Sequence, residues 1–184
     1  MKKKSSAEKK NSSVREMTVC AVLCAVLCVL CPLTVPVGAV PVTLATFAVC
    51  CIGGAAGCKR GTLAVLLYLL IGAVGVPVFA GFRGGVAALV GPTGGFLLGY
   101  LLLVVVAGAV SDRTDARAAL CGAFCGGTAA LYLCGALVYA LSAKVSFLAA
   151  LSVCVLPFLP FDAVKIAAAT ALSPRFKKAL RAMK

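Results

Sequence analysis

Two residues of opposite charge, Asp162 and Lys165, stand inside an apolar stretch of the sequence. Their spacing of three residues places them on one face of a helix. Charges within a membrane segment are costly and usually face a bundle interior or a watery cavity. The pair therefore predicts one of two arrangements. It is a ligand site, in which the carboxylate accepts ligand N–H groups and the ammonium meets a ligand anion, or it is a self-neutralising ion pair.

Two glycine-rich stretches are further candidates for ligand contact. Arg83 lies in the first, residues 77–85, and either assists in binding a ligand anion or is a solvated loop charge. The second is Gly91-Pro92-Thr93-Gly94-Gly95, which lacks the Gly-Lys-Ser/Thr ending of a nucleotide-binding loop. Its glycines permit close backbone approach to a neighbouring helix or to a ligand, and the residues alone favour neither.

Catalytic and metal-binding groups are not expected in this chain. It has no histidine, no paired catalytic carboxylates and no convincing nucleophile with a base. The eleven cysteines are scattered through apolar runs and are interpreted as small hydrophobic packing residues. If the protein drives active transport, the energy must come from another polypeptide or from an ion gradient.

The composition predicts an all-α integral membrane protein. Apolar residues make up 62% of the 184 residues and charged residues only 12%. The hydrophobic region 17–173 is long enough for about six helices that each cross a bilayer. Basic tails are expected at 1–16 and 174–184. Nucleic-acid binding is not expected despite the +13 charge, because the basic residues lie in short flanks rather than on one face.

Prolines and polar flanks divide the hydrophobic region into the expected helices. They span about 18–33, 42–57, 62–76, 86–110, 118–141 and, after a break at Pro157 and Pro160, from near Pro160 to 173. Proline ends a helix because it cannot donate the backbone hydrogen bond, and this places the first end at the cluster of Pro32, Pro36 and Pro41. Non-helical backbone at membrane depth occurs where it is buried or lines a cavity, so the break near Pro160 is a site candidate.

The distribution of Lys and Arg predicts the orientation. Cytoplasmic loops carry the excess of these residues. If the N-terminus is cytoplasmic, both tails, the 59–60 flank and the 113–117 flank fall on the cytoplasmic side, and the outer loops receive only Arg83 and Lys144. Both termini are therefore expected in the cytoplasm, in a bacterial-type plasma membrane, and Asp162 lies toward the outside.

Four stretches, in order, resemble the BioY family. They are Val40-Pro41-Val42-Thr43-Leu44, the run from Ala64 to Leu70 with Gly75-Val76-Pro77-Val78-Phe79-Ala80, Gly91-Pro92-Thr93-Gly94-Gly95, and Pro157-Phe158-Leu159-Pro160-Phe161-Asp162 with Lys165. The resemblance covers roughly Thr18 to Leu172. It departs from the family pattern at Phe161, where glycine is frequent, and at Ala45, where glutamine is frequent.

The resemblance implies a six-helix S component of an energy-coupling factor (ECF) transporter, which binds biotin without a cofactor of its own. A related vitamin or a biotin precursor is the alternative ligand. The resemblance also implies partners, namely a transmembrane coupling subunit and two ATPase subunits. A stand-alone facilitator remains the alternative function.

The same resemblance assigns roles to individual residues. Asp162 and Lys165 match the polar pair of the family's ligand pocket, and Thr43, Gly91, Thr93 and Gly94 fall in the matching stretches as substrate-binding candidates. Ala21 and Ala25 form a small-xxx-small pattern, which permits helix packing. They match the family's alanine-based docking motif for the coupling subunit.

Overall fold

Helices account for most of the computed structural model, which describes residues 2–35 and 42–182, with side chains from Val14 onward. Pro36 and Pro41, predicted to help end the first helix, lie outside these residues. The elements run in the order α1 (Lys2–Leu30), β1 (Thr34–Val35), β2 (Val42–Thr43), α2 (Ala45–Ala73), α3 (Val86–Val90), α4 (Gly94–Arg113), α5 (Arg117–Ala143), α6 (Phe147–Cys154) and α7 (Leu159–Ala182).

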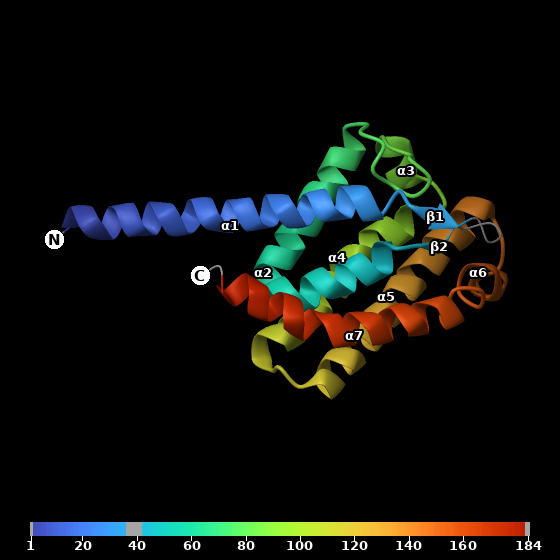
Figure 1. Cartoon of the computed structure of the whole chain (residues 1–184). Helices are drawn as coiled ribbons and strands as arrows, with labels where there is room; N and C mark the ends of the chain where they lie inside the picture. The colour runs from blue at the N-terminus through green and yellow to red at the C-terminus, as the bar shows by residue number, and fades with distance from the viewer. Residues whose placement is uncertain (1, 36–41, 183–184) are drawn as a thin grey trace.

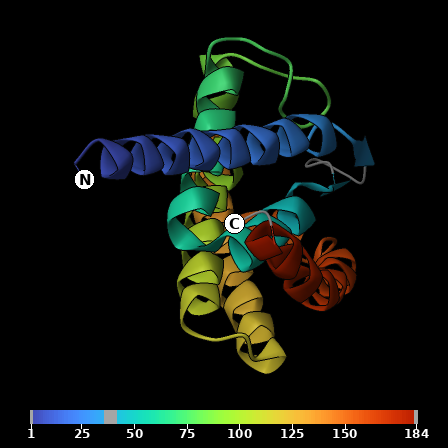
Figure 2. The same ribbon diagram turned by 60° about the vertical axis from the view of Figure 1, so that its left-hand side comes forward.

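The helices pack around α2, which contacts α1, α4 and α7, while α5 packs on α4. The core includes Leu27, Tyr68, Leu103 and Phe124, all fully buried. The antiparallel β1–β2 hairpin and α6 lie at the end of the molecule away from the N-terminal part of α1, which extends beyond the other helices (Figures 1 and 2). The predicted break before α7 is present, because α6 and α7 are bent by 58° to each other.

The helix α2 is interrupted at Gly57, between the two helices predicted from the sequence. Gly57 has φ 79° and ψ −178°, a conformation open almost only to glycine. An uninterrupted helix would join the Cys58 N–H to the Gly54 carbonyl, four residues earlier. Here the Asp112 carboxylate accepts from the Cys58 N–H at 2.9 Å, and the Ser111 hydroxyl donates to the Gly54 carbonyl at 2.6 Å. Two consecutive side chains of α4 thus replace the missing backbone bond.

Replacing Ser111 with alanine is expected to lower stability by about 1–3 kcal/mol, because the Gly54 carbonyl loses its partner in a buried place. The apparent melting temperature of the detergent-purified protein measures the effect. Ser152→Ala is the matched control, because its exposed hydroxyl donates to the Ala149 carbonyl one turn away within the same helix. An equal shift in both variants would contradict the role given to Ser111.

The helix predicted over 86–110 is wrong in one respect, because it is two helices, α3 and α4. Gly91 has an extended backbone with ψ −179°, and Thr93 is the residue before α4. Pro92 explains the break, because the residue before a proline is disfavoured in the helical conformation. The long apolar run after Gly85 hid this interruption in the sequence.

The polar tails differ from the sequence expectation, because both continue the helices beside them. The first helix was predicted from about Thr18 and begins at Lys2, and α7 continues past Ser173 to Ala182 with Pro174 in its interior. Lysine, glutamate and alanine are good helix formers, so a polar flank can extend a helix beyond its apolar part. Hydropathy marks where the apolar part ends but not where the helix ends.

Among the described residues, α2, α4 and α5 are long and apolar enough to cross a membrane. The bent pair α6 and α7 makes a fourth span if it is counted as one. The sequence-based number of six counts α1 and treats the two parts of α2 separately, and it stays a prediction.

Candidate functional site

A pocket opens beside the first turn of α7, at the hairpin end of the molecule. The 75–85 loop, α4, α5 and the start of α7 provide most of its walls. The lining residues are Thr43, Thr46, Phe79, Ala80, Arg83, Ala88, Thr93, Phe96, Leu97, Tyr100, Leu131, Tyr132, Phe158, Asp162 and Lys165. The sequence-predicted residues Asp162, Lys165, Arg83, Thr43 and Thr93 are therefore brought together from distant parts of the chain.

The Asp162 carboxylate is the most buried charge of this pocket, with 4% of the residue exposed. Its Oδ1 accepts from the Lys165 ammonium at 2.7 Å, and its Oδ2 accepts from the Tyr132 hydroxyl at 2.5 Å. It also lies in the first turn of α7, where the helix dipole favours a negative charge. These three interactions compensate for the cost of burying the carboxylate.

The carboxylate keeps capacity to bind a ligand while it is paired in this way. Two oxygens offer about four lone-pair positions, and Tyr132 and Lys165 take one each. The Lys165 ammonium has three donors and uses one of them on Asp162. The pair can therefore accept ligand N–H groups on one side and donate to a ligand oxygen on the other.

Aromatic rings form much of the remaining wall, from Phe79, Phe96, Tyr100 and Phe158. Phe79 is held in place by Tyr68, whose ring lies edge-on at 5.6 Å between centroids and whose hydroxyl donates to the Val78 carbonyl at 3.2 Å. A mostly apolar wall with a few fixed polar groups is typical of a small-molecule site. The arrangement suits a ligand with an apolar body and polar ends.

Some of the other predicted site residues line the pocket, such as Arg83 and Thr43, and some do not. Arg83 is exposed, and its carbonyl accepts from the Phe79 N–H at 2.9 Å, which closes the 79–83 loop that forms part of the pocket lining. Thr43 accepts from the Ala45 N–H at the start of α2 with its hydroxyl, at 3.2 Å. Gly91 and Gly94 are not among the lining residues, and a Cβ on Gly94 would lie 1.7 Å from the Leu89 carbonyl oxygen. Gly94 is thus packed against the α3 backbone.

The sequence-based interpretation did not single out Tyr132 or Tyr100. Tyr132 lies in a long apolar helix thirty residues before Asp162, with no motif around it. The only sequence signal is that tyrosine is scarce, with four in the chain, and that a tyrosine inside a membrane helix needs a partner for its hydroxyl.

The predicted docking residues Ala21 and Ala25 are exposed on α1. An adjoining face of the helix, which includes Cys20, Cys24 and Leu27, is buried against the rest of the molecule. The pair of alanines thus leaves a shallow strip of small side chains on the outer face of α1. Burial of Cys20 and Cys24 agrees with their interpretation as packing residues.

The fold and this pocket define a helical membrane protein that binds a small molecule. The chain belongs to the BioY family, whose model matches residues 1–182. It is 40% identical over 147 residues to the biotin transporter BioY of Thermotoga maritima, and this match covers 79% of this chain and 86% of the relative. It is 35% identical over 163 residues to a probable biotin transporter BioY of Pyrococcus horikoshii, over 89% of this chain and 96% of the relative.

A solved structure shares the fold. The crystal structure of the S component for biotin from an ECF-type ABC transporter superposes with a TM-score of 0.84 and 25% identity, over 91% of this chain and 93% of that one. The relatives are transporters, and this chain is accordingly a multi-pass membrane protein.

Proposed function

We propose that this chain is the substrate-capture subunit of an ECF-type vitamin transporter and that it binds biotin in the Asp162 pocket. The observation that carries the proposal is the buried Asp162–Lys165 pair, held by Tyr132 in an aromatic-walled pocket. Membership of the BioY family and the names of its relatives point to the same ligand.

The chemistry of biotin matches the pocket group by group. Its ureido ring offers N–H donors to the Asp162 carboxylate, and its carbonyl or carboxylate accepts from Lys165. Its apolar bicyclic body fits beside Phe79, Phe96 and Phe158. Arg83, at the exposed part of the pocket, is the proposed partner of the valerate carboxylate. Thr43 and Thr93 are the proposed secondary polar contacts. Gly91 and Gly94 act indirectly, because they set the backbone conformation at the start of α4.

The proposed topology has six membrane-spanning segments with both termini in the cytoplasm. The break at Gly57 supports counting α2 as two segments. Asp162 and Lys177 are at opposite ends of α7, about 22 Å apart at the helical rise of 1.5 Å per residue. The Lys/Arg-rich flanks gather at the Lys177 end, and this charge excess supports a cytoplasmic position. The pocket then opens to the outside, where a scarce nutrient arrives.

The proposed partners are a transmembrane coupling subunit and two ATPase subunits, which supply the energy that this chain has no motif to provide. The exposed Ala21 and Ala25 strip on α1 is the proposed contact with the coupling subunit. Small side chains allow two helix backbones to approach closely, so this strip suits helix packing within the membrane.

Uptake into vesicles tests the proposal against a stand-alone facilitator. Radiolabelled biotin is supplied to vesicles that contain this chain alone or this chain with the coupling and ATPase subunits and ATP. We expect accumulation against a gradient only with the partners and ATP. Entry of biotin by the chain alone, without ATP and only until the inside and outside concentrations are equal, would support the facilitator instead.

Tyr132→Phe is expected to weaken biotin binding about tenfold or more, because hydrogen bonds to charged groups contribute about 1.5–3 kcal/mol. The change removes the donor to Asp162 Oδ2 and leaves the ring in place. Equilibrium binding to the purified variant measures the loss. Tyr139→Phe, on the same helix and outside the pocket lining, is the control and should bind like the wild type. Equal affinities for the two variants would show that Tyr132 does not position the carboxylate.

A further inference from the structure

A second cavity of about 320 Å³ lies at the other end of the molecule from the pocket. It is formed by α1, α2 at the Gly57 break, the end of α4 and the C-terminal part of α7. Four basic residues and two acidic ones line it: Lys59, Arg60, Lys177, Arg181, Glu16 and Asp112. We call this cavity the basic cleft.

The acidic side chains of the basic cleft are already engaged. Asp112 accepts from the Cys58 N–H at 2.9 Å, and Glu16 pairs with one nitrogen of Arg60 at 3.0 Å. Both carboxylates are therefore already paired with other groups of this chain. The cleft keeps a net positive lining.

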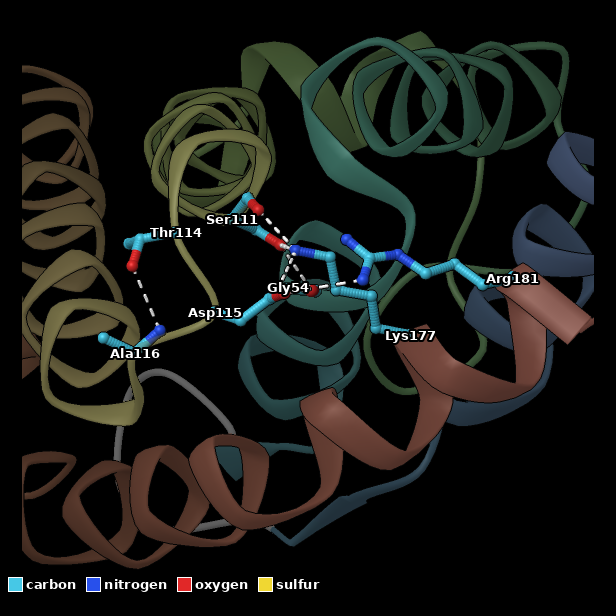
Figure 3. A network of polar contacts seen from close by, with 7 residues as sticks. All are labelled: Gly54, Ser111, Thr114, Asp115, Ala116, Lys177 and Arg181. Atoms are coloured by element: carbon cyan, nitrogen blue, oxygen red, sulfur yellow. Dashed lines mark hydrogen bonds and ion pairs between the residues drawn. The ribbon is translucent and has the colours of Figure 1, made fainter.

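The basic side chains differ in how far they are used. The Lys177 ammonium is nearly buried and donates to the carbonyl and hydroxyl of Ser111 and to Asp115 (Figure 3). This contact holds the pKa of the exposed Asp115 carboxyl below its usual value. Arg181 reaches Asp115 with a single nitrogen at 3.4 Å. A guanidinium has five donors, so Arg181 and Arg60 retain several that can meet another anion, and Lys59 is exposed.

The position of the basic cleft along the helices indicates where the anion comes from. Glu16 directly precedes the apolar run that begins at Met17, and Lys59 follows the apolar first part of α2. On α7 the apolar run ends at Ser173, one turn before Lys177. The cleft therefore lies at the level where the membrane-embedded part of the protein ends, which is the level of lipid headgroups.

We propose that the basic cleft binds the phosphate of an anionic phospholipid. Arg60 and Arg181 can each form two parallel bonds to phosphate oxygens, a geometry in which arginine is stronger than lysine. The lipid would contact both α2 and α7 beside Gly57, where the backbone hydrogen bonding of α2 is interrupted.

Native mass spectrometry of the detergent-purified full chain tests this proposal. The protein is titrated with dioleoylphosphatidylglycerol and, separately, with dioleoylphosphatidylcholine. We expect the wild type to retain the anionic lipid preferentially. Lys59→Gln with Arg181→Gln should weaken its retention roughly twenty-fivefold, since each cation near a membrane surface is worth about a fivefold change. Arg175→Gln, on the same helix and outside the cleft lining, is the matched control and should retain the lipid.

Three results would overturn the proposal. The first is equal retention of the two lipids by the wild type. The second is an equal loss in Arg175→Gln and in the double variant, which would indicate a diffuse charge effect. The third is full displacement of the anionic lipid by millimolar inorganic phosphate, which would make the cleft a site for small soluble anions. If the double variant is not monodisperse, the single variants Lys59→Gln and Arg181→Gln, each with an expected fivefold loss, decide the question.

Discussion

Replacing Asp162 with asparagine is expected to weaken biotin binding about a hundredfold or more. Removing one partner of a buried, hydrogen-bonded charge pair costs about 2–5 kcal/mol, because the other charge is left unpaired. Here the unpaired group would be Lys165, whose side chain is only 12% exposed. The amide also offers one acceptor oxygen in place of two, so it cannot serve Tyr132, Lys165 and a ligand N–H together. Equilibrium binding to the purified variant measures the loss.

The matched control for this change is Asp115→Asn, the same chemical substitution at an exposed position at the far end of the molecule. Asp115 pairs with Lys177 and Arg181 and does not line the pocket. We expect its biotin affinity to stay within about twofold of the wild type, as for a screened surface pair. If both variants lost affinity equally, Asp162 would not be the ligand-binding carboxylate.

The largest expected effect on stability is that of Gly57→Ala. A Cβ at this position would lie 2.1 Å from Asp112 Oδ1, and the backbone has φ 79°. A side chain there costs about 1–3 kcal/mol in backbone strain, and displacing Asp112 releases the Cys58 N–H for a further 1–3 kcal/mol. We expect a fall in the melting temperature and in the monodisperse fraction of the purified protein. The effect should exceed that of Ser111→Ala.

Gly126→Ala is the control for this glycine. It lies within α5, and no heavy atom stands within 4 Å of an added Cβ. Alanine is favoured over glycine in a helix interior by about 1 kcal/mol, so this variant should be as stable as the wild type or more stable. If Gly57→Ala unfolded at the wild-type temperature, α2 would not depend on the break at Gly57.

The residues of the pocket that carry charge could be predicted from the sequence, because membrane segments contain so few of them. Asp162 and Lys165 stood out by their surroundings, and their helical spacing placed them on one face, where the ion pair seen at 2.7 Å is one of the two arrangements that the sequence left open. The start of the last helix near Pro160 was also correct to one residue, since proline is favoured in a first turn.

The parts that could not be predicted depend on contacts between distant residues. Tyr132 reaches Asp162 only because α5 packs beside α7, and no local pattern marks that contact. The replacement of a backbone hydrogen bond at Gly57 by Ser111 and Asp112 spans more than fifty residues. The extended polar ends of α1 and α7 were missed for another reason, because hydropathy reports burial in lipid and not helix formation.

Equilibrium binding of radiolabelled biotin to the purified wild-type chain tests the central claim most directly. We predict saturable binding of one biotin per chain with a dissociation constant below the micromolar range. A related vitamin or a biotin precursor, added as a competitor, should displace biotin only at higher concentration. Absence of binding below the micromolar range, or stronger binding of the competitor, would contradict the assignment of biotin to the Asp162 pocket.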